Sequence, residues 1–235
     1  MEEKTPVEKL IDSTRVYLKL DFSKIGLTSI AGIIALIGLF MNNVAIIIGA
    51  MLLSPLLGPI YAFAINTAVG DGRDAFKSIS NLLIMLFVVV ALSFLFTQTI
   101  TPFFNLTVTN EILSRMDANI IYIIMALLLG FASILALSKG ISESIAGVAI
   151  AAAILPPTVV TGISLSLFPT QTLTPLVLTV DNLLGLMAGS LIATLVLNIG
   201  PRRYYEKTVA KKFIMRISLV IMILLVVLFG ISVSI

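Results

Sequence analysis

The chain has 235 residues, of which 59% are hydrophobic and only 11% are charged, and fifteen basic side chains against twelve acidic ones give a net charge of +3. Soluble domains average about 25% charged residues, whereas several apolar runs here reach the roughly 20 residues that cross a bilayer. The absence of cysteine and histidine excludes disulfides, thiol chemistry and histidine acid–base catalysis. The composition therefore predicts an integral membrane protein that is not an enzyme.

Residues 1–24 are predicted to form a cytoplasmic amphipathic helix. Thr5 and Glu8 make a capping box, with Pro6 at the first helical position. Apolar side chains gather on one face of this helix, namely Val7, Leu10, Ile11, Tyr17 and Leu18. Such a helix is expected to lie on the inner leaflet of the membrane.

Seven apolar segments follow, and they are predicted to be transmembrane helices. The second and fifth are interrupted near their middles, by Ser54-Pro55 and by Pro156-Pro157. The segments cover residues 25–41, 44–69, 78–100, 120–138, 143–168, 175–199 and 213–235.

The basic residues of the loops predict the orientation. If each interrupted segment crosses once, fourteen of the fifteen basic residues share one side, and Arg115 alone lies on the other. Cytoplasmic loops carry the Lys/Arg excess, so we expect a multi-pass protein of the cell membrane with a cytoplasmic N-terminus and an external C-terminus. Re-entrant hairpins at the two interruptions would weaken the bias to twelve against three, and they remain an open alternative.

The first interruption has a counterpart later in the chain. AMLLSP at 50–55 aligns with AAILPP at 152–157, an offset of 102 residues, and SNLL at 80–83 aligns with DNLL at 181–184. The order of plain, broken and plain helix also occurs twice. Because each repeat has three crossings, the second repeat enters from the opposite face, an arrangement typical of secondary transporters.

The predicted fold is therefore an all-α polytopic membrane protein of about seven transmembrane helices. A 3+3 inverted repeat with two mid-span broken helices is followed by one extra C-terminal helix. The predicted units are the N-terminal helix 1–24, the first repeat 25–100, an external loop 101–119, the second repeat 120–199, a basic cytoplasmic loop 200–212 and the last helix 213–235.

Each break is expected to expose backbone polar groups. Proline has no N–H and opens the helical ladder, and Ser54 and Pro55 suit the N-cap and first position of a new half-helix. In hydrocarbon each unpaired group costs several kcal/mol, so a break persists only where protein, water or a ligand completes it. Carbonyl ends favour Na⁺ and N–H ends favour an anionic group. The alternative is that the prolines only kink helices for packing.

Polar residues inside the spans are the other candidates. Asp181 is the one acidic residue well inside an apolar run, so it is predicted to carry a proton or bind a cation; a structural or vestibule role is the alternative. Asn81 and Asn182 are predicted to brace the broken helices. The candidate binding residues are Gly49, Leu52, Ser54, Pro55, Gly58, Asn66, Asn81, Ile154, Pro156, Pro157, Thr158, Thr161, Asp181 and Asn182, with Ser54, Thr158 and Asp181 as candidate Na⁺ ligands.

Three stretches resemble the DUF389 family of prokaryotic integral membrane proteins. They are IIIGAMLLSPLLGPIYAFAINTAVGD, AGVAIAAAILPPTVVTGISLSL and DNLLGLMAG, and the resemblance covers about residues 25 to 200. The family name records an unknown function. The resemblance therefore implies a prokaryotic membrane protein and no particular substrate.

The predicted function is transport, and it rests on the repeat. We expect a secondary transporter of a small solute or ion that works by alternating access and is coupled to Na⁺ or H⁺. An ion channel, or a non-transporting module that binds lipid or scaffolds a partner through its basic segments, are the alternatives. The expected partners are the lipid bilayer and a small solute or ion, with no nucleic acid, and a homo-oligomer is left open.

Overall fold

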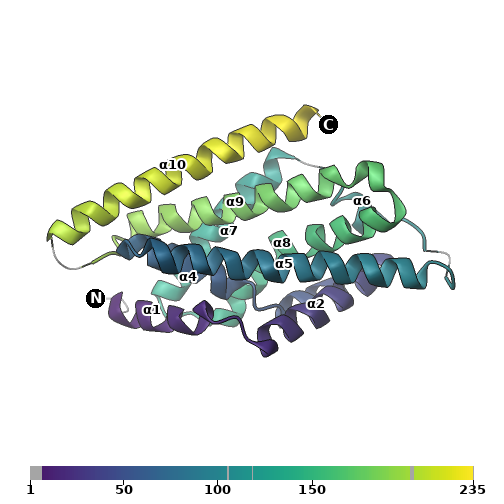
Figure 1. Cartoon of the computed structure of the whole chain (residues 1–235), viewed down its shortest axis with the longest axis horizontal. Coiled ribbons are helices and arrows are strands. Elements are labelled where there is room, and N and C mark those ends of the chain that lie inside the picture. The colour runs from purple at the N-terminus through teal and green to yellow at the C-terminus, as the bar shows by residue number, and fades with distance from the viewer. Residues whose placement is uncertain (1–6, 105, 118, 202–203, 235) are drawn as a thin grey trace.

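The computed structural model describes residues 7–104, 106–117, 119–201 and 204–234, and within these ranges every regular element is helical (Figure 1). The helices are α1 (Val7–Thr14), α2 (Phe22–Phe40), α3 (Val44–Leu53), α4 (Leu57–Val69), α5 (Gly72–Ile100), α6 (Asn110–Leu113), α7 (Ile120–Ser138), α8 (Glu143–Leu167), α9 (Leu173–Val196) and α10 (Tyr204–Ser234), with 3-10 turns η1 (Arg15–Leu18) and η2 (Pro169–Gln171).

The predicted membrane architecture is confirmed. Six helices of the described chain are long and apolar enough to cross a membrane, and the bent pair α3–α4 gives a seventh candidate when it is counted as one span. Helix α7 covers the predicted segment 120–138, whereas α5 and α10 begin earlier than predicted, at Gly72 and Tyr204. The early start of α5 follows from Asp71, whose carboxylate accepts a hydrogen bond from the N–H of Asp74 at 3.0 Å and so caps the helix.

Polar hinge residues set the turns between the spans. Between α2 and α3, Asn42 adopts a left-handed conformation (φ 51°) and Asn43 accepts hydrogen bonds from the first N–H groups of α3. Between α4 and α5, Gly70 ends the helix at φ 86°, a conformation that glycine adopts without steric cost. These local signals explain why the chain reverses at those places.

The bundle has two ends. At the first, which we call the N-terminal end, Gly70 lies against Ala210 and Gly200 against Ala68. At the other, the distal end, Thr109 donates to the carbonyl of Leu39 at 2.6 Å. Helix α3 begins at the distal end and α4 finishes at the N-terminal end, so the bent pair runs from one end to the other.

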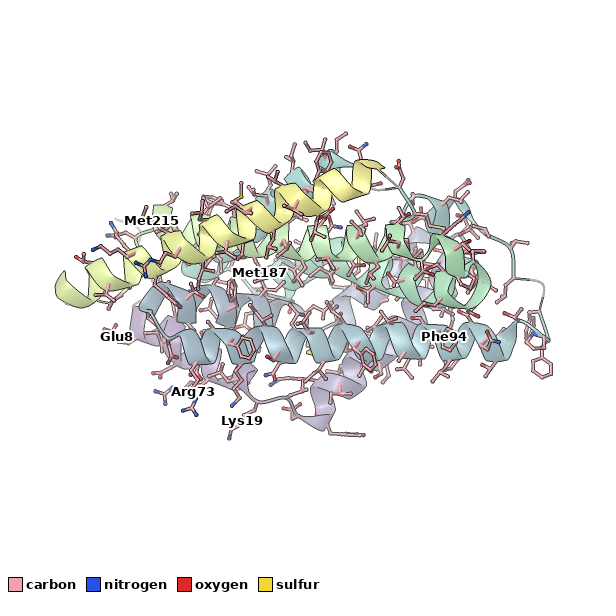
Figure 2. The ribbon with its side chains drawn as sticks, turned by 45° about the horizontal axis from the view of Figure 1, so that its top comes forward. Glu8, Lys19, Arg73, Phe94, Met187 and Met215 are labelled. Carbon is pink, nitrogen blue, oxygen red and sulfur yellow. The ribbon has the colours of Figure 1, made fainter. Side chains whose placement is uncertain are left out.

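The side chains of Figure 2 show the same two ends. Lys19 and Arg73 lie at the N-terminal end, and Phe94 of α5 lies toward the distal end. The one basic residue of the distal loops, Arg115, pairs with Glu111 at 2.8 Å. The charge asymmetry on which the orientation argument depends is thus present in the fold, while the orientation itself stays a prediction.

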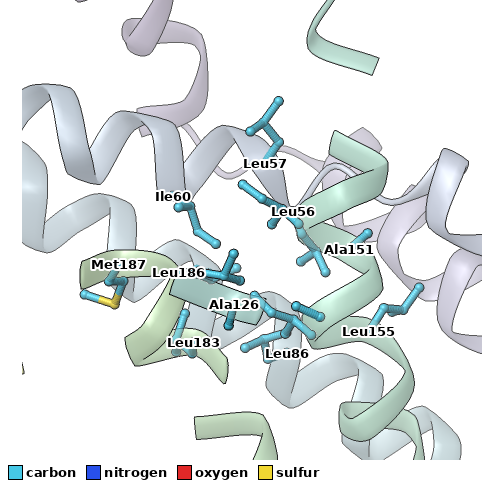
Figure 3. Packing of buried hydrophobic residues seen from close by; sticks show 14 of the residues in the cluster. Leu56, Leu57, Ile60, Leu86, Ala126, Ala151, Leu155, Leu183, Leu186 and Met187 are labelled. Atoms are coloured by element: carbon cyan, nitrogen blue, oxygen red, sulfur yellow. The ribbon is translucent and has the colours of Figure 1, made fainter. Parts of the chain in front are cut away.

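The core forms around α4 and α9. Every residue of α4 from Leu57 to Ala68 is buried, and Figure 3 shows Leu56 and Ile60 among buried side chains of α8 and α9. Glycines allow α7 and α9 to approach closely, since a Cβ at Gly189 would lie 1.9 Å from the carbonyl oxygen of Leu127. The GxxxG pattern at residues 185–189 therefore serves packing within the chain.

Helix α10 lies at the edge of the bundle, against α9 and α4 (Figure 1). Large apolar side chains on its outer face, such as Met215, Leu219 and Val226, are more than half exposed. Such an exposed apolar face is suited to contact lipid or a neighbouring subunit.

The second predicted break is wrong. Helix α8 is continuous from Glu143 to Leu167 and contains Pro156 and Pro157 inside it. Only the first interruption separates two helices, α3 and α4, whose axes differ by 51°. Helices α5 and α9, at corresponding positions of the proposed repeat, run in opposite directions (Figure 1), but the inverted repeat itself stays a prediction.

The N-terminal segment packs on protein. Leu10 is 6% exposed and Thr14 is 1% exposed, because α1 and η1 lie against α4. The predicted capping residues Thr5 and Pro6 lie outside the described residues. We call residues 7–18, which form α1 and η1, the N-terminal strap.

Candidate functional site

The break between α3 and α4 occupies three residues. Ser54 follows the last residue of α3, and its N–H donates to the carbonyl of Met51 at 3.3 Å. Pro55 has no N–H to donate, and α4 begins after Leu56, which offers no side-chain cap. The prediction that Ser54 is the N-cap of the second half-helix is therefore wrong, because Ser54 instead ends the first one. The last carbonyls of α3 and the first N–H groups of α4 lack helical partners.

A cleft of about 240 Å³ opens at this break. Three helix ends meet around it, since its walls come from the end of α3, the start of α4 and the first turns of α8, together with η1. The residues that matter for its chemistry are Tyr17, Leu52, Ser54, Pro55, Gly58, Glu143 and Ser144.

Tyr17 and Glu143 form a hydrogen-bonded pair in this cleft. The hydroxyl of Tyr17 donates to Oε2 of Glu143, and its ring occupies the space that a side chain at Gly58 would need, since a Cβ there would lie 2.1 Å from Cδ1 of Tyr17. Burial, and then the hydrogen bond to Glu143, raise the pKa of Tyr17 well above that of a free tyrosine. The phenol therefore stays protonated at neutral pH and remains a donor.

Contacts with two helices hold the strap over the cleft. The side-chain amide of Asn81 on α5 donates to the carbonyls of Tyr17 and Leu18, at 3.3 and 3.1 Å. On α4, the hydroxyl of Tyr61 donates to the carbonyl of Leu10 at 3.3 Å, and its ring meets that of Tyr17 edge to face at 6.4 Å. Asn81 thus braces the strap, and not a broken helix as predicted.

Ser54 carries an unused polar group into this site. Its side chain is 7% exposed, lines the cleft, and has an Oγ without a hydrogen-bond partner. A buried hydroxyl without a partner costs about 1–3 kcal/mol. A rotation of the Ser54 side chain that turns Oγ into the cleft would allow a ligand or an ordered water to remove that cost.

A second cleft lies beside α1, the first part of the strap. It has a volume of about 290 Å³ and is lined by Lys9, Ser13, Tyr61 and Ser142, among others. Glu143 lines both clefts. The first residue of α8 is therefore the common point of the two.

A separate group of predicted residues lies within the bundle, between α8 and α9. The side-chain amide of Asn182 donates to the carbonyl of Ala153 at 2.8 Å. This is the carbonyl that Pro157, four residues on, cannot pair. Asn182 therefore bonds to α8 as expected of a bracing residue, but α8 is continuous and not the broken helix of the prediction. Its neighbour Asp181 is 1% exposed, and its Oδ1 has no hydrogen-bond partner.

The remaining polar candidates bond within their own helices. Thr158 donates to the carbonyl of Ile154 at 2.7 Å, and Thr161 donates to that of Pro157 at 2.9 Å. Asn66 donates to the carbonyl of Ala62 at 2.8 Å. Gly49 is half-buried in α3, and a Cβ built on it would meet nothing within 4 Å apart from its chain neighbours and the backbone of its own helix.

The predicted residues are thus divided between the cleft and the bundle interior. Leu52, Ser54, Pro55 and Gly58 line the cleft, and the candidates on α8 and α9 do not. Of the three candidate Na⁺ ligands only Ser54 lines the cleft, and joint coordination by Ser54, Thr158 and Asp181 stays a prediction.

Tyr17 and Glu143 escaped the sequence analysis. Tyr17 counted only as part of an apolar face, and Glu143 as the polar start of a span. One local signal was present. Ser142 caps α8 by accepting from the N–H of Ser144 at 3.3 Å, and a carboxylate directly after such a cap lies at a helix start.

Comparison with known proteins gives a family and no activity. A family model described as "Domain of unknown function (DUF389)" matches residues 51–188. An uncharacterised protein of Methanocaldococcus jannaschii is 29% identical over 219 residues, which are 90% of this chain and 67% of that protein. No solved structure matches the chain.

Proposed function

The chain belongs to the DUF389 family, and we propose that it is a membrane transport protein, which moves a small solute or ion by alternating access coupled to Na⁺ or H⁺. The family description assigns no activity, so the proposal rests on the site of this chain. The observation that carries it is the cleft at the α3–α4 break, in which Ser54 and Pro55 line a space of about 240 Å³.

A broken span beside a cleft is the arrangement that transporters use to hold ligands. Backbone groups at the break need partners, and discontinuous helices supply carbonyls and N–H groups to ions and substrates in such proteins. The buried and unpartnered Oγ of Ser54 adds a further unsatisfied group at the same place. A ligand that enters the cleft would satisfy these groups together.

Asp181 is the proposed coupling residue. Its carboxyl is 1% exposed within α9, and its Oδ1 lacks a partner. A buried carboxyl inside a span is suited to take up a proton or bind a cation during transport. The excess of basic residues at the N-terminal end supports an orientation with that end in the cytoplasm of a cell membrane.

Flux in proteoliposomes tests the proposal. Purified protein is reconstituted, and uptake of labelled Na⁺ and candidate solutes is measured under imposed Na⁺ and proton gradients. Saturable, gradient-driven uptake is expected for the wild type, with strong loss in Pro55→Ala and in Asp181→Asn. If both variants take up solute as fast as the wild type does, the assignment of Pro55 and Asp181 to the transport site is wrong. Steady single-channel currents in planar bilayers would instead identify a channel.

A further inference from the structure

The charges around the break cleft favour one sign of ligand. Among the described residues that line it, Glu143 is the one acidic side chain, and there is no lysine or arginine. Tyr17 donates to Oε2 of Glu143, which fixes the carboxylate in place and leaves Oε1 for a ligand. The cleft therefore presents a negative charge without a basic partner on its own walls.

Lys24 and Lys9 do not pair with Glu143 within the cleft. Lys24 lies over the ring of Tyr17, at 5.9 Å from the ring centroid, but its ammonium donates to the carbonyls of Val16 and Lys19 and pairs with Asp21 at 3.7 Å. Lys9 lines the second cleft and not this one.

The neutral oxygens of the cleft point to the same ligand class. Ser54 lines the cleft and has a buried Oγ without a partner, which a rotation of its side chain can turn toward a ligand, and the last carbonyls of α3 end at the break. The C-terminal end of α3 carries negative partial charge, whereas the starts of α4 and α8 carry positive partial charge, so the full charge of Glu143 decides the sign. Carboxylate, hydroxyl and carbonyl oxygens are the groups that bind alkali cations and also accept hydrogen bonds from ammonium groups.

We propose that the break cleft is a cation site, in which Glu143 is the counter-charge and Ser54 completes the contacts. The ligand is a small monovalent cation, either an alkali metal ion or an organic ammonium group. This inference rests on the proposed transport function and names the ligand class of the same cleft. Tyr17 is a positioning residue, because it acts on the cation through Glu143.

Binding to the purified full chain in detergent tests this inference. Calorimetric titrations use sodium chloride, potassium chloride and methylammonium chloride, with ionic strength held by N-methylglucamine chloride. The first two salts probe a metal ion and the third probes an ammonium group. Sodium acetate and sodium phosphate at fixed Na⁺ probe the opposite case, an anion site.

Saturable binding of at least one cation is expected in the wild type. Glu143→Gln should weaken it by at least about tenfold, which corresponds to about 1.4 kcal/mol, and Ser54→Ala should weaken it by about threefold, as expected for loss of one neutral contact. Asp12→Asn is the matched control, because it removes an exposed carboxylate of the strap that pairs with Arg15 outside the cleft. The cation affinity of Asp12→Asn should stay within about twofold of that of the wild type.

The inference is overturned if Glu143→Gln binds cations as the wild type does, or if saturation follows the anion. Thermal melting without added cation checks that Glu143→Gln is folded, and Glu143→Asp, which keeps the charge, should retain part of the affinity. Cation binding by a wild-type chain that shows no flux would support the cation site and contradict the transport proposal. If Glu143→Gln keeps both its flux and its cation affinity, the proposed cation site is contradicted and the transport proposal is not.

Discussion

Two similar sequences, AMLLSP at 50–55 and AAILPP at 152–157, have different structures in this chain. The first ends α3 and opens a bend of 51° before α4. The second, with one more proline, passes through the middle of α8 without interrupting it. Proline content therefore does not decide which helix breaks.

The difference lies in which group donates a hydrogen bond to the carbonyl four residues before Pro55 and before Pro157. In α8 the carbonyl of Ala153, four residues before Pro157, accepts a hydrogen bond from Asn182 at 2.8 Å. Near the first motif, the corresponding asparagine of α5, Asn81, donates to the strap instead. The carbonyl of Met51, four residues before Pro55, takes the N–H of Ser54, and the helix ends.

Removal of the Asn182 amide should have the largest effect on the stability of the helical bundle as a whole. Asn182→Leu leaves the buried carbonyl of Ala153 unpaired, and we expect a loss of about 1–3 kcal/mol in the free energy of unfolding, measured by denaturation in detergent micelles. Adding Pro157→Ala should restore much of the loss, because an alanine supplies the missing N–H to the same carbonyl.

Asn81→Leu is the matched control for this cycle, because its acceptors lie in the strap and not in a span. We expect it to loosen the strap and to cost less in global unfolding. Equal losses for the two asparagines, or no rescue by Pro157→Ala, would contradict the proposed origin of the difference between the motifs.

The two prolines should differ in their effect on transport. Pro55→Ala adds an N–H at the break and favours a continuous helix, so we expect uptake in proteoliposomes to fall about tenfold, the equivalent of about 1.4 kcal/mol. Pro157→Ala changes a helix that is already continuous, and its uptake should stay close to that of the wild type. Equal loss in both variants would show that the two motifs act alike.

Much of the fold was predictable, because the apolar runs and polar hinges are local signals. The span α7 starts directly after its cap Asn119, and the chain reverses at Asn42 and Gly70. The continuity of α8 was not predictable from its prolines, because the carbonyl of Ala153 takes its hydrogen bond from Asn182 of another helix. The pairing of Tyr17 with Glu143 was not predictable either, because the two residues are 126 positions apart in the sequence. Contacts between distant segments therefore explain both the wrong prediction of a second break and the two residues that the sequence did not indicate.

The strap should respond to a single methyl group at the first motif. In Gly58→Ala the new Cβ would lie 2.1 Å from Cδ1 of Tyr17, and overpacking of this kind costs about 1–3 kcal/mol. We expect faster hydrogen exchange in residues 7–18, with a smaller change in the rest of the bundle. Gly49→Ala is the control, since nothing lies within 4 Å of its Cβ. Equal exchange in both variants would show that the strap does not rest on Gly58.

The smallest expected effect is on the titration of Tyr17, which reports the contact between the strap and α8. Burial and Glu143 both raise the pKa of Tyr17, so the folded chain favours the protonated phenol. The resulting stability is present at neutral pH and is lost as the pH rises through the raised pKa. The tyrosinate absorbance of the wild type, after subtraction of Tyr17→Phe, should therefore appear at higher pH than that of free tyrosine. In Glu143→Gln it should appear earlier than in the wild type but still later than in free tyrosine, because burial remains. Asp12→Asn should leave the midpoint of the Tyr17 titration unchanged. An unchanged midpoint in Glu143→Gln would mean that the carboxylate does not hold the phenol. The contact between Tyr17 and Glu143 would then no longer distinguish the surroundings of the first motif from those of the second.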